Sequence, residues 1–164
     1  MNIKTLKSSI ALRIVLTLAC CALVSSAFAA GNDLQGVKAA NAQFYSALNA
    51  MFAGNAVPMT NVWSHANDVA YLGPDGVFLV GWKPILADWK SQAAKKLGGK
   101  VTATNIHIIT GKDLAVVQDI ERGVNYSHGK PQVVSIRATN VFRLEDGKWK
   151  MVGHHTDKLP YLSK

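Results

Sequence analysis

Cysteine is scarce in this 164-residue chain and confined to one place. Its two cysteines, Cys20 and Cys21, are neighbours in an apolar stretch near the N-terminus. If that stretch is removed, the remaining chain has no disulfide, no catalytic thiol and no cysteine metal site. A domain of this kind must be held together by its hydrophobic core, and the chain is long enough to bury one.

A long hydrophobic run is also lacking. The main apolar run, residues 14–24, is shorter than the roughly 20 residues that a membrane-spanning helix needs. Small residues follow at Ala27-Phe28-Ala29, in the positions that a signal peptidase recognises. The basic residues that precede the run are Lys4, Lys7 and Arg13.

We therefore predict that residues 1–29 are a cleaved signal peptide and that residues 30–164 form one domain, periplasmic or secreted, with no membrane partner after cleavage. A lipid on Cys20 is the alternative, because residues 17–20 faintly resemble a lipoprotein cleavage box. Cleavage would remove three basic residues and lower the formal net charge from +8 to +5. The remaining lysines are dispersed without interleaved aromatic residues, so nucleic acid is not an expected partner.

Three amphipathic helices are predicted from the spacing of apolar residues. The first has apolar residues at three- and four-residue steps from Leu34 to Phe52 and ends at Gly54-Asn55. A shorter helix spans Pro58 to Ser64, with proline in its first turn. The third begins at Gly81-Trp82 and ends at Gly98-Gly99.

The rest of the chain is predicted to form strands joined by tight turns. Short strands at residues 69–72 and 77–80 are followed, after the third helix, by long strands at residues 102–110 and 114–126 and by a C-terminal hairpin. This order favours an α+β fold with three N-terminal helices packed on a curved antiparallel sheet. The sequence has no internal repeat, low-complexity tract or second-domain linker.

The C-terminal hairpin, Ser135 to Asp157, determines the predicted site. Asp146-Gly147 between two strand-forming runs predicts a two-residue loop. Because side chains alternate along a strand, counting outward from this loop places Asn140 and His155 on the inner face. A longer loop with a bulge would shift this parity. The predicted cross-strand pairs are Leu144–Trp149, Phe142–Met151, Asn140–Gly153 and Ala138–His155.

Asn140 and His155 stand where a packed core would have valine or leucine. They are either a tolerated polar pair near a sheet end or the floor of a pocket whose polar groups orient a ligand. As a histidine, His155 could act as acid, base or ligand partner near neutral pH. A loop with an even number of residues at His128-Gly129 would place Asp119 and Glu121 beside it. An odd number would place Gln118 and Arg122 there instead.

The order of these motifs resembles the NTF2-like superfamily, and specifically its SnoaL-like branch, over residues 34–162. The likeness rests on Phe52-Ala-Gly-Asn55, on Trp63 followed by Tyr71-Leu-Gly-Pro-Asp-Gly76, on Gly81-Trp82, and on Asn140-Val-Phe-Arg with the closing His-His-Thr156. It implies a cone of curved sheet closed by three helices, with an internal pocket, commonly in a homodimer. Members include ketosteroid isomerase-like enzymes, polyketide cyclases, dehydratases and binding domains.

Ketosteroid isomerase chemistry needs an Asp base and an oxyanion hole made of a Tyr and a protonated Asp. The resemblance places the base position at Gly73 and the second Asp position within residues 137–140, where no Asp stands. Tyr45 lies about half a turn from the position of the family tyrosine. We therefore expect no ketosteroid isomerase activity.

Three classes of function remain open. The first is an exported domain that binds a small hydrophobic or aromatic molecule in the cone. The second is a cyclase, isomerase or hydratase that uses His155 with an inward Asp119 as catalytic residues. The third is a dimeric scaffold with a filled cone, which a cavity smaller than about 300 Å³ would favour.

We favour the binding domain, as a homodimer. No cofactor is expected, and His65 with Asp68 lack a third metal ligand nearby. The residues expected to contact the ligand are Trp63, Tyr71, Trp89, Asn140, Phe142, Met151 and His155.

Overall fold

The computed structural model describes residues 33–162 of the chain. Two compact units make up the chain, Met1–Gln35 and Gly36–Lys164, and the fold below is that of the second unit. The predicted signal peptide lies outside the described residues. Within the described range, no helix is both long enough and apolar enough to cross a bilayer.

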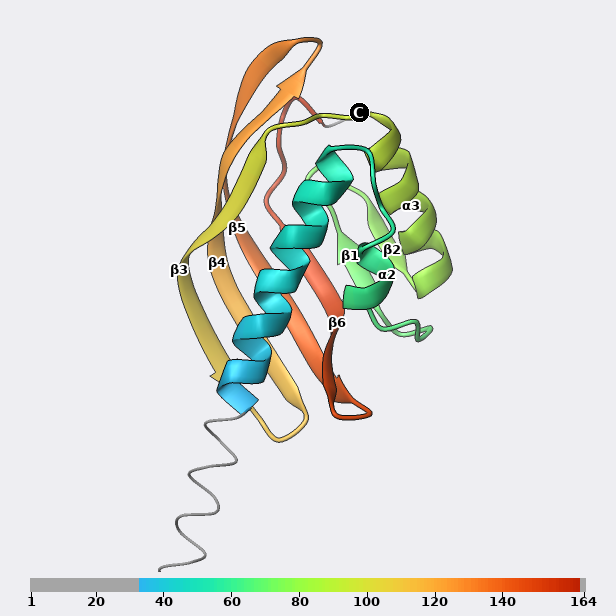
Figure 1. Ribbon diagram of the computed structural model, residues 1–164, viewed down its shortest axis with the longest axis vertical. Coiled ribbons are helices and arrows are strands. Elements are labelled where there is room, and N and C mark those ends of the chain that lie inside the picture. Colours follow the sequence, from blue (N-terminus) through green and yellow to red (C-terminus); the bar gives the residue numbers. More distant parts are fainter. Residues whose placement is uncertain (1–32, 163–164) are drawn as a thin grey trace, which may run out of the picture. The chain divides into compact units, whose positions relative to one another are not determined.

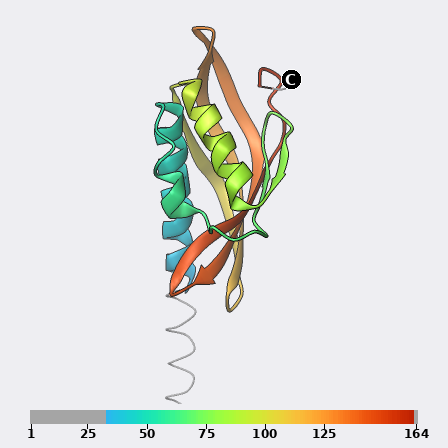
Figure 2. The ribbon, with the colours of Figure 1, turned by 90° about the vertical axis from the view of Figure 1, so that its right-hand side faces the viewer.

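A six-stranded sheet forms the framework of the second unit (Figure 1), with the strand order β2-β1-β6-β5-β4-β3. Residues 36–52 of a helix that spans residues 33–52 lie on the same side of this sheet as α3 (Trp82–Ala94) (Figure 2). Between them in sequence comes the one-turn helix α2 (Met59–Val62). The strands are β1 (Ala70–Leu72), β2 (Phe78–Val80), β3 (Lys100–Thr110), β4 (Leu114–Ser127), β5 (Lys130–Glu145) and β6 (Lys148–Thr156).

The helices form where the apolar spacing predicts them, because one face of each is buried. Helix 33–52 ends before Gly54, whose φ of 99° suits glycine. With four residues, α2 is shorter than the predicted Pro58–Ser64. The buried apolar residues of the two longer helices include Val37, Phe44, Leu48, Met51, Ile85 and Trp89.

The α+β class is confirmed, and the sheet differs from the prediction in one pairing. Strand β1 lies parallel to β6, with Ala70 opposite Gly153 and Leu72 opposite His155. The other strand pairs are antiparallel. A wholly antiparallel sheet is therefore wrong, because the chain passes through β2, α3 and three long strands before β6 returns beside β1.

The two-residue loop of the C-terminal hairpin is confirmed. Asp146 and Gly147 have φ values of 48° and 74°, as a type I′ turn requires, and Glu145 pairs with Lys148. The predicted Leu144–Trp149 and Phe142–Met151 pairs follow from it.

A β-bulge then reverses the parity of β6. Phe142 pairs with Met151 but Val141 pairs with Gly153, so Val152 is an extra residue in this strand. The next pairs are Asn140–His154 and Ala138–Thr156 in place of the predicted Asn140–Gly153 and Ala138–His155.

His155 therefore points away from the helices, and its predicted inward position is wrong. The His155 side chain is exposed, whereas His154 is 4% exposed. The local signal of the bulge is Gly153, beside the extra residue, because an isolated glycine within a strand often marks a bulge.

The loop at His128-Gly129 contains two residues, because Ser127 pairs with Lys130. This even number places Asp119 and Glu121 on the inner face, where they are 4% and 5% exposed. The alternative, with Gln118 and Arg122 inside, is excluded.

Candidate ligand-binding chamber

A small, partly enclosed chamber lies between the helices and the inner face of the sheet, with a volume of about 30 Å³. Its apolar lining comes from Leu48, Phe52, Trp89, Val101 and Val134. Its polar lining comes from Tyr71, Gln92, Glu121, Asn125 and His154. Pro74, Leu159 and Leu162 complete the lining.

His154 is oriented by a chain of amide side chains. Asn140 Nδ2 donates to Asn41 Oδ1 at 2.9 Å, which leaves Asn140 Oδ1 as an acceptor. His154 Nδ1 lies 2.5 Å from Asn140 Oδ1 and therefore carries the ring proton. His154 Nε2 is left with a free lone pair, and its nearest carboxyl oxygen, Glu121 Oε1, is 4.0 Å away.

Two carboxyl groups share the hydroxyl of Tyr45. The hydroxyl donates to Asp119 Oδ1 at 2.7 Å and lies 3.2 Å from Glu121 Oε1. Burial, and then the neighbouring Asp119, raise the pKa of Glu121 to about 8. Burial also raises the pKa of Asp119, against hydrogen bonds from Tyr45 and Asn41. The pKa of Tyr45 is raised by burial and by both carboxylates.

The contact between His154 and Glu121 is one of neutral groups. Burial, and to a smaller extent the neighbouring His155, lower the pKa of His154 to about 3. At neutral pH the imidazole is therefore uncharged, while Glu121 is mostly protonated. At a separation of 4.0 Å the two form neither an ion pair nor a direct hydrogen bond, although they are close in space. A ligand group between them could donate to the nitrogen and bond to the carboxyl group.

The structure brings the predicted aromatic residues together, but only some line the chamber. The rings of Tyr71 and Trp89 lie 4.7 Å apart, and Tyr71 stacks on His154 at 5.7 Å. Tyr71 and Trp89 both line the chamber. The other predicted site residues on the inner face are buried but do not line it: Trp63, Asp119, Asn140, Phe142 and Met151.

Sequence reasoning did not assign a site role to His154, Gln92 or Asn125. Without the bulge, the alternation of side chains from the two-residue loop would place His154 on the outer face. Gln92 has a signal in the sequence, because it lies three residues after Trp89 on the apolar face of α3. Its amide donates to the Tyr71 hydroxyl at 2.9 Å.

Gly73, the position that the resemblance assigns to an isomerase base, has no room for a side chain. A Cβ built there would lie 2.5 Å from the Tyr71 hydroxyl oxygen. Tyr71 is 1% exposed and held by Gln92, so it cannot easily move away. The absence of isomerase activity remains a prediction.

No group of three or more His, Cys, Asp or Glu residues in the described range could hold a metal ion. His65 stacks on Trp82 with ring centroids 4.6 Å apart, and its Nε2 lies 2.9 Å from Thr60 O. Asp68 forms an ion pair with Arg143 at 2.7 Å. Both residues thus have structural partners.

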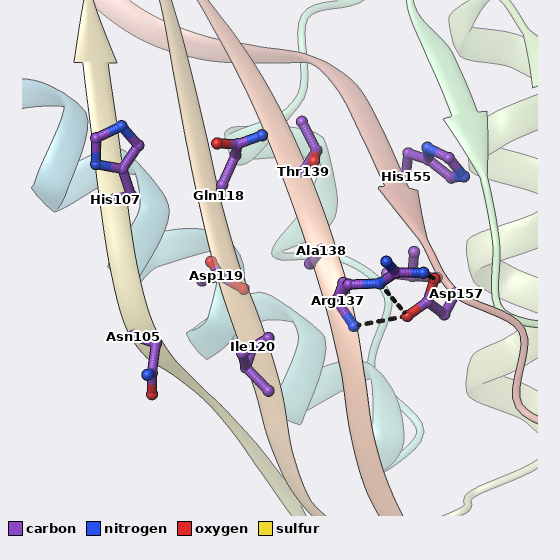
Figure 3. Close-up of a pocket in the computed structure, with 11 residues that line it drawn as sticks. Asn105, His107, Gln118, Asp119, Ile120, Arg137, Ala138, Thr139, His155 and Asp157 are labelled. Atoms are coloured by element: carbon purple, nitrogen blue, oxygen red, sulfur yellow. Dashed lines mark hydrogen bonds and ion pairs between the residues drawn. The ribbon is translucent and has the colours of Figure 1, made fainter.

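A separate hollow of about 540 Å³ lies on the sheet face turned away from the helices (Figure 3). One row of outward side chains crosses four strands here: His107, Gln118, Thr139 and His155. Beside it, two guanidinium nitrogens of Arg137 donate to Asp157 at 2.8 and 2.9 Å. This pair is exposed, so it contributes little to stability.

Comparison with known proteins gives a family match and several similar folds. The model of the SnoaL-like domain matches residues 37–158. No curated protein matches the chain.

Three solved structures illustrate the fold. A proposed dehydratase of the NTF2-like family from Streptomyces avermitilis is 23% identical, with a TM-score of 0.68, over 79% of this chain and 98% of that one. A proposed calcium/calmodulin-dependent protein kinase type II association domain from Thiobacillus denitrificans is 28% identical, with a TM-score of 0.64, over 74% and 94%. A proposed aromatic ring hydroxylase from Novosphingobium aromaticivorans is 17% identical, with a TM-score of 0.67, over 78% and 90%.

Proposed function

The chain belongs to the SnoaL-like domain family of NTF2-like folds, and on that premise we propose that it binds a small, largely apolar molecule in the chamber. The observation that carries the proposal is how the chamber is closed. Two of its lining residues, Leu159 and Leu162, come from the segment after β6 and not from the helices or the sheet. We call residues 158–162 the C-terminal lid.

The lid contains no strand or regular helix. Its backbone bonds to the body through Leu159 N–H, which donates to Pro74 O at 2.8 Å. The Tyr161 hydroxyl lies 3.4 Å from Asn125 Oδ1, a long hydrogen bond. Leu159 is 7% exposed and packs in the hydrophobic core. The segment lies outside the strands and helices, and such segments open at lower free-energy cost than a strand inside a sheet.

The chamber volume explains why the lid must move. About 30 Å³ holds roughly one water-sized group, whereas small-molecule sites usually measure about 300 Å³ or more. With the lid closed, the chamber is as small as expected for a scaffold whose cone is filled by side chains. Displacing Leu159 and Leu162 would enlarge the chamber and admit a ligand, so the lid distinguishes a binding domain from a scaffold.

The test is a melting-temperature screen against neutral apolar and aromatic molecules, with the full chain and with a variant that ends at Asp157. A ligand that binds only the folded state at 100 times its Kd stabilises by about 2.7 kcal/mol. We expect at least one compound to raise the Tm of both proteins and to associate faster with the truncated one. No shift in either protein would favour the filled scaffold.

Acid–base catalysis is a second candidate, supported by the 4.0 Å separation of His154 Nε2 and Glu121 Oε1. It replaces the His155–Asp119 pair expected from the sequence. In a dehydration, the neutral imidazole would take a proton from carbon while Glu121 protonates the departing hydroxyl, so that water leaves and a double bond forms. Both groups are in the required protonation states at neutral pH.

A small β-hydroxyketone tests this candidate, since its dehydration produces a conjugated enone that absorbs in the ultraviolet. We expect His154→Gln and Glu121→Gln to abolish any turnover and His155→Gln to retain it. Turnover that survives both of the first two substitutions would exclude this mechanism.

We also propose that the outer face of the sheet pairs two copies of the chain. Among residues 33–162 no helix covers this face, and Ile109 is 55% exposed in line with Val116 and Val141. Two similar structures are named as an association domain and as a hub homology domain. Light scattering after gel filtration should give twice the chain mass. Ile109→Lys should lower the measured mass to that of a single chain. Val57→Lys, at an exposed position outside the sheet, should leave it at twice the chain mass.

Export is the remaining proposal, supported by the order of basic residues, apolar run and Ala27-Phe28-Ala29. Mass spectrometry of protein collected outside the cytoplasm should find Ala30 as the first residue. An intact Met1, or a lipid on Cys20, would contradict it.

A further inference from the structure

The hydrogen-bonding state of the chamber floor indicates which ligands it can accept. We infer that the chamber takes an uncharged molecule with a hydroxyl group on an apolar body, the hydroxyl lying between His154 Nε2 and Glu121. This inference rests on the proposed binding function. It adds the chemical class of the ligand.

The first step is the acceptor. His154 Nδ1 is committed to Asn140 Oδ1, so Nε2 presents a lone pair and no proton. The ring is fixed by stacking on Tyr71 and by contact with Phe44, at centroid distances of 5.7 and 4.8 Å. A ligand that bonds to Nε2 must therefore bring its own proton.

The second step concerns Glu121, which faces His154 Nε2 across the gap. Tyr45 has a single hydroxyl proton, and the shorter contact, 2.7 Å, gives it to Asp119 rather than to Glu121 at 3.2 Å. Glu121 therefore retains hydrogen-bonding capacity toward the chamber that it lines. The gap of 4.0 Å to His154 Nε2 is spanned by a hydroxyl oxygen about 2.8 Å from each atom.

The third step is charge. The chamber lining contains Glu121 but no lysine or arginine, so a carboxylate or phosphate would meet no cation. An ammonium group would have to displace the proton of Glu121, whose pKa burial raises to about 8. A ketone or ether has no proton to give to His154 Nε2. A hydroxyl group satisfies all three conditions.

The fourth step is the rest of the ligand. Around this floor the lining is mostly hydrocarbon and aromatic, which favours an apolar body. One further polar atom faces no partner: Trp89 lines the chamber, and its Nε1 is buried without a hydrogen bond.

Four probes of nearly equal size and different head groups test the inference on protein from the full chain. They are benzyl alcohol, benzyl methyl ether, benzoate and benzylamine, each titrated at pH 7 while the ring nitrogens of His154 are followed by NMR. We expect the alcohol to bind about tenfold more tightly than the ether, the effect of one hydrogen bond. Benzoate should not bind, and benzylamine should bind less tightly than the alcohol. Only the alcohol should shift His154 Nε2.

The control and the variants separate the outcomes. His155→Gln should leave the ranking unchanged, and His154→Gln should remove the preference for alcohol over ether; if the latter variant does not fold, the ranking on the unmodified chain decides. Equal binding of ether and alcohol would overturn the hydroxyl inference and leave the proposed function intact. Tightest binding of benzoate or benzylamine would overturn it in favour of a charged ligand. If no probe binds the full chain or the variant ending at Asp157, both proposals fail.

Discussion

Two neighbouring histidines on β6 have opposite environments. His154 is enclosed by Phe44, Tyr71 and the amide of Asn140, whereas His155 stands in the outer row of the sheet. The bulge at Val152 alone determines which of them reaches the interior. Chemical reactivity at this position is therefore set by backbone register, since the two side chains are identical.

NMR titration of the His154 ring tests its buried position. His154, whose pKa is lowered to about 3 by burial, should stay neutral down to about pH 4. His154→Gln should destabilise the fold, because it removes the ring that bonds to Asn140 Oδ1 and packs against Phe44 and Tyr71. His155→Gln is the matched control and should leave the denaturation midpoint unchanged. A His154 ring that becomes protonated near pH 6 would contradict the observed register.

Tyr45 is the residue that makes two buried carboxyl groups tolerable. Tyr45→Phe removes the only hydroxyl that contacts both Asp119 Oδ1 and Glu121 Oε1 in the described part of the chain. The loss should cost about 1–3 kcal/mol of unfolding free energy, because buried polar atoms lose their partner. Urea denaturation measures it. Tyr126→Phe, at a side chain 47% exposed, should change little, and equal effects of the two substitutions would refute this role.

At the scale of elements, tight turns and a bulge determine which faces of the long strands are buried. Both two-residue loops have positive φ at both central residues: 51° and 74° at His128-Gly129, and 48° and 74° at Asp146-Gly147. These turns fix the register of β4 with β5 and of β5 with the first part of β6. The bulge then changes the register once.

Gly147 tests the turn in isolation. A Cβ added there would meet nothing within 4 Å, so only its φ of 74° opposes a side chain. Gly147→Val should cost about 1–2 kcal/mol or more, since a branched residue is strained at positive φ. Gly147→Asn should cost clearly less, because asparagine tolerates this conformation. If the two variants lost equal amounts of unfolding free energy, backbone strain at positive φ would not be the cause of the loss.

Most elements could be predicted from the sequence, and much of the site could not. Apolar periodicity located the helices, and Asp146-Gly147 gave the correct loop, because these signals are local. The inward Asp119 depended on the length of one loop, which left two answers open. Gly153 indicates that a bulge can form here but not that it forms, and the parallel β1–β6 pairing joins segments far apart in sequence, which no local pattern records. The C-terminal lid has no periodic pattern of apolar residues, so its contact with the chamber could not be predicted from the sequence.

For the molecule as a whole, two buried groups control stability in opposite directions. Glu121 has a folded pKa of about 8 against an ordinary value of 4.5, so its stabilising contribution is complete below pH 4.5 and is lost as the pH rises toward 8. His154 has a folded pKa of about 3 against an ordinary 6.5, so its contribution is complete above pH 6.5 and is lost toward pH 3. Asp119, whose pKa is also raised, acts in the same direction as Glu121.

The unfolding free energy should therefore be greatest between about pH 4.5 and 6.5, where the two effects oppose each other, and decline on both sides. Each group contributes a slope of at most about 1.4 kcal/mol per pH unit. Denaturant titrations at pH 4, 5.5 and 8 measure the profile. Glu121→Gln should flatten the decline above pH 6.5 and leave the acid side as it is. If the unfolding free energy of this variant still declined as steeply above pH 6.5, groups other than Glu121 would cause the decline.

The parallel pairing of β1 with β6 has a consequence for the order in which the chain can assemble. The last strand to be synthesised stands between β1 and β5, in the interior of the sheet. Until β6 is present, the hairpin of β1 and β2, with three residues in each strand, has no sheet to join and is too small to be stable alone. Contacts between residues so far apart in sequence also slow folding. A ribosome-bound chain therefore cannot complete this sheet until β6, the last of its six strands in sequence, has left the exit tunnel.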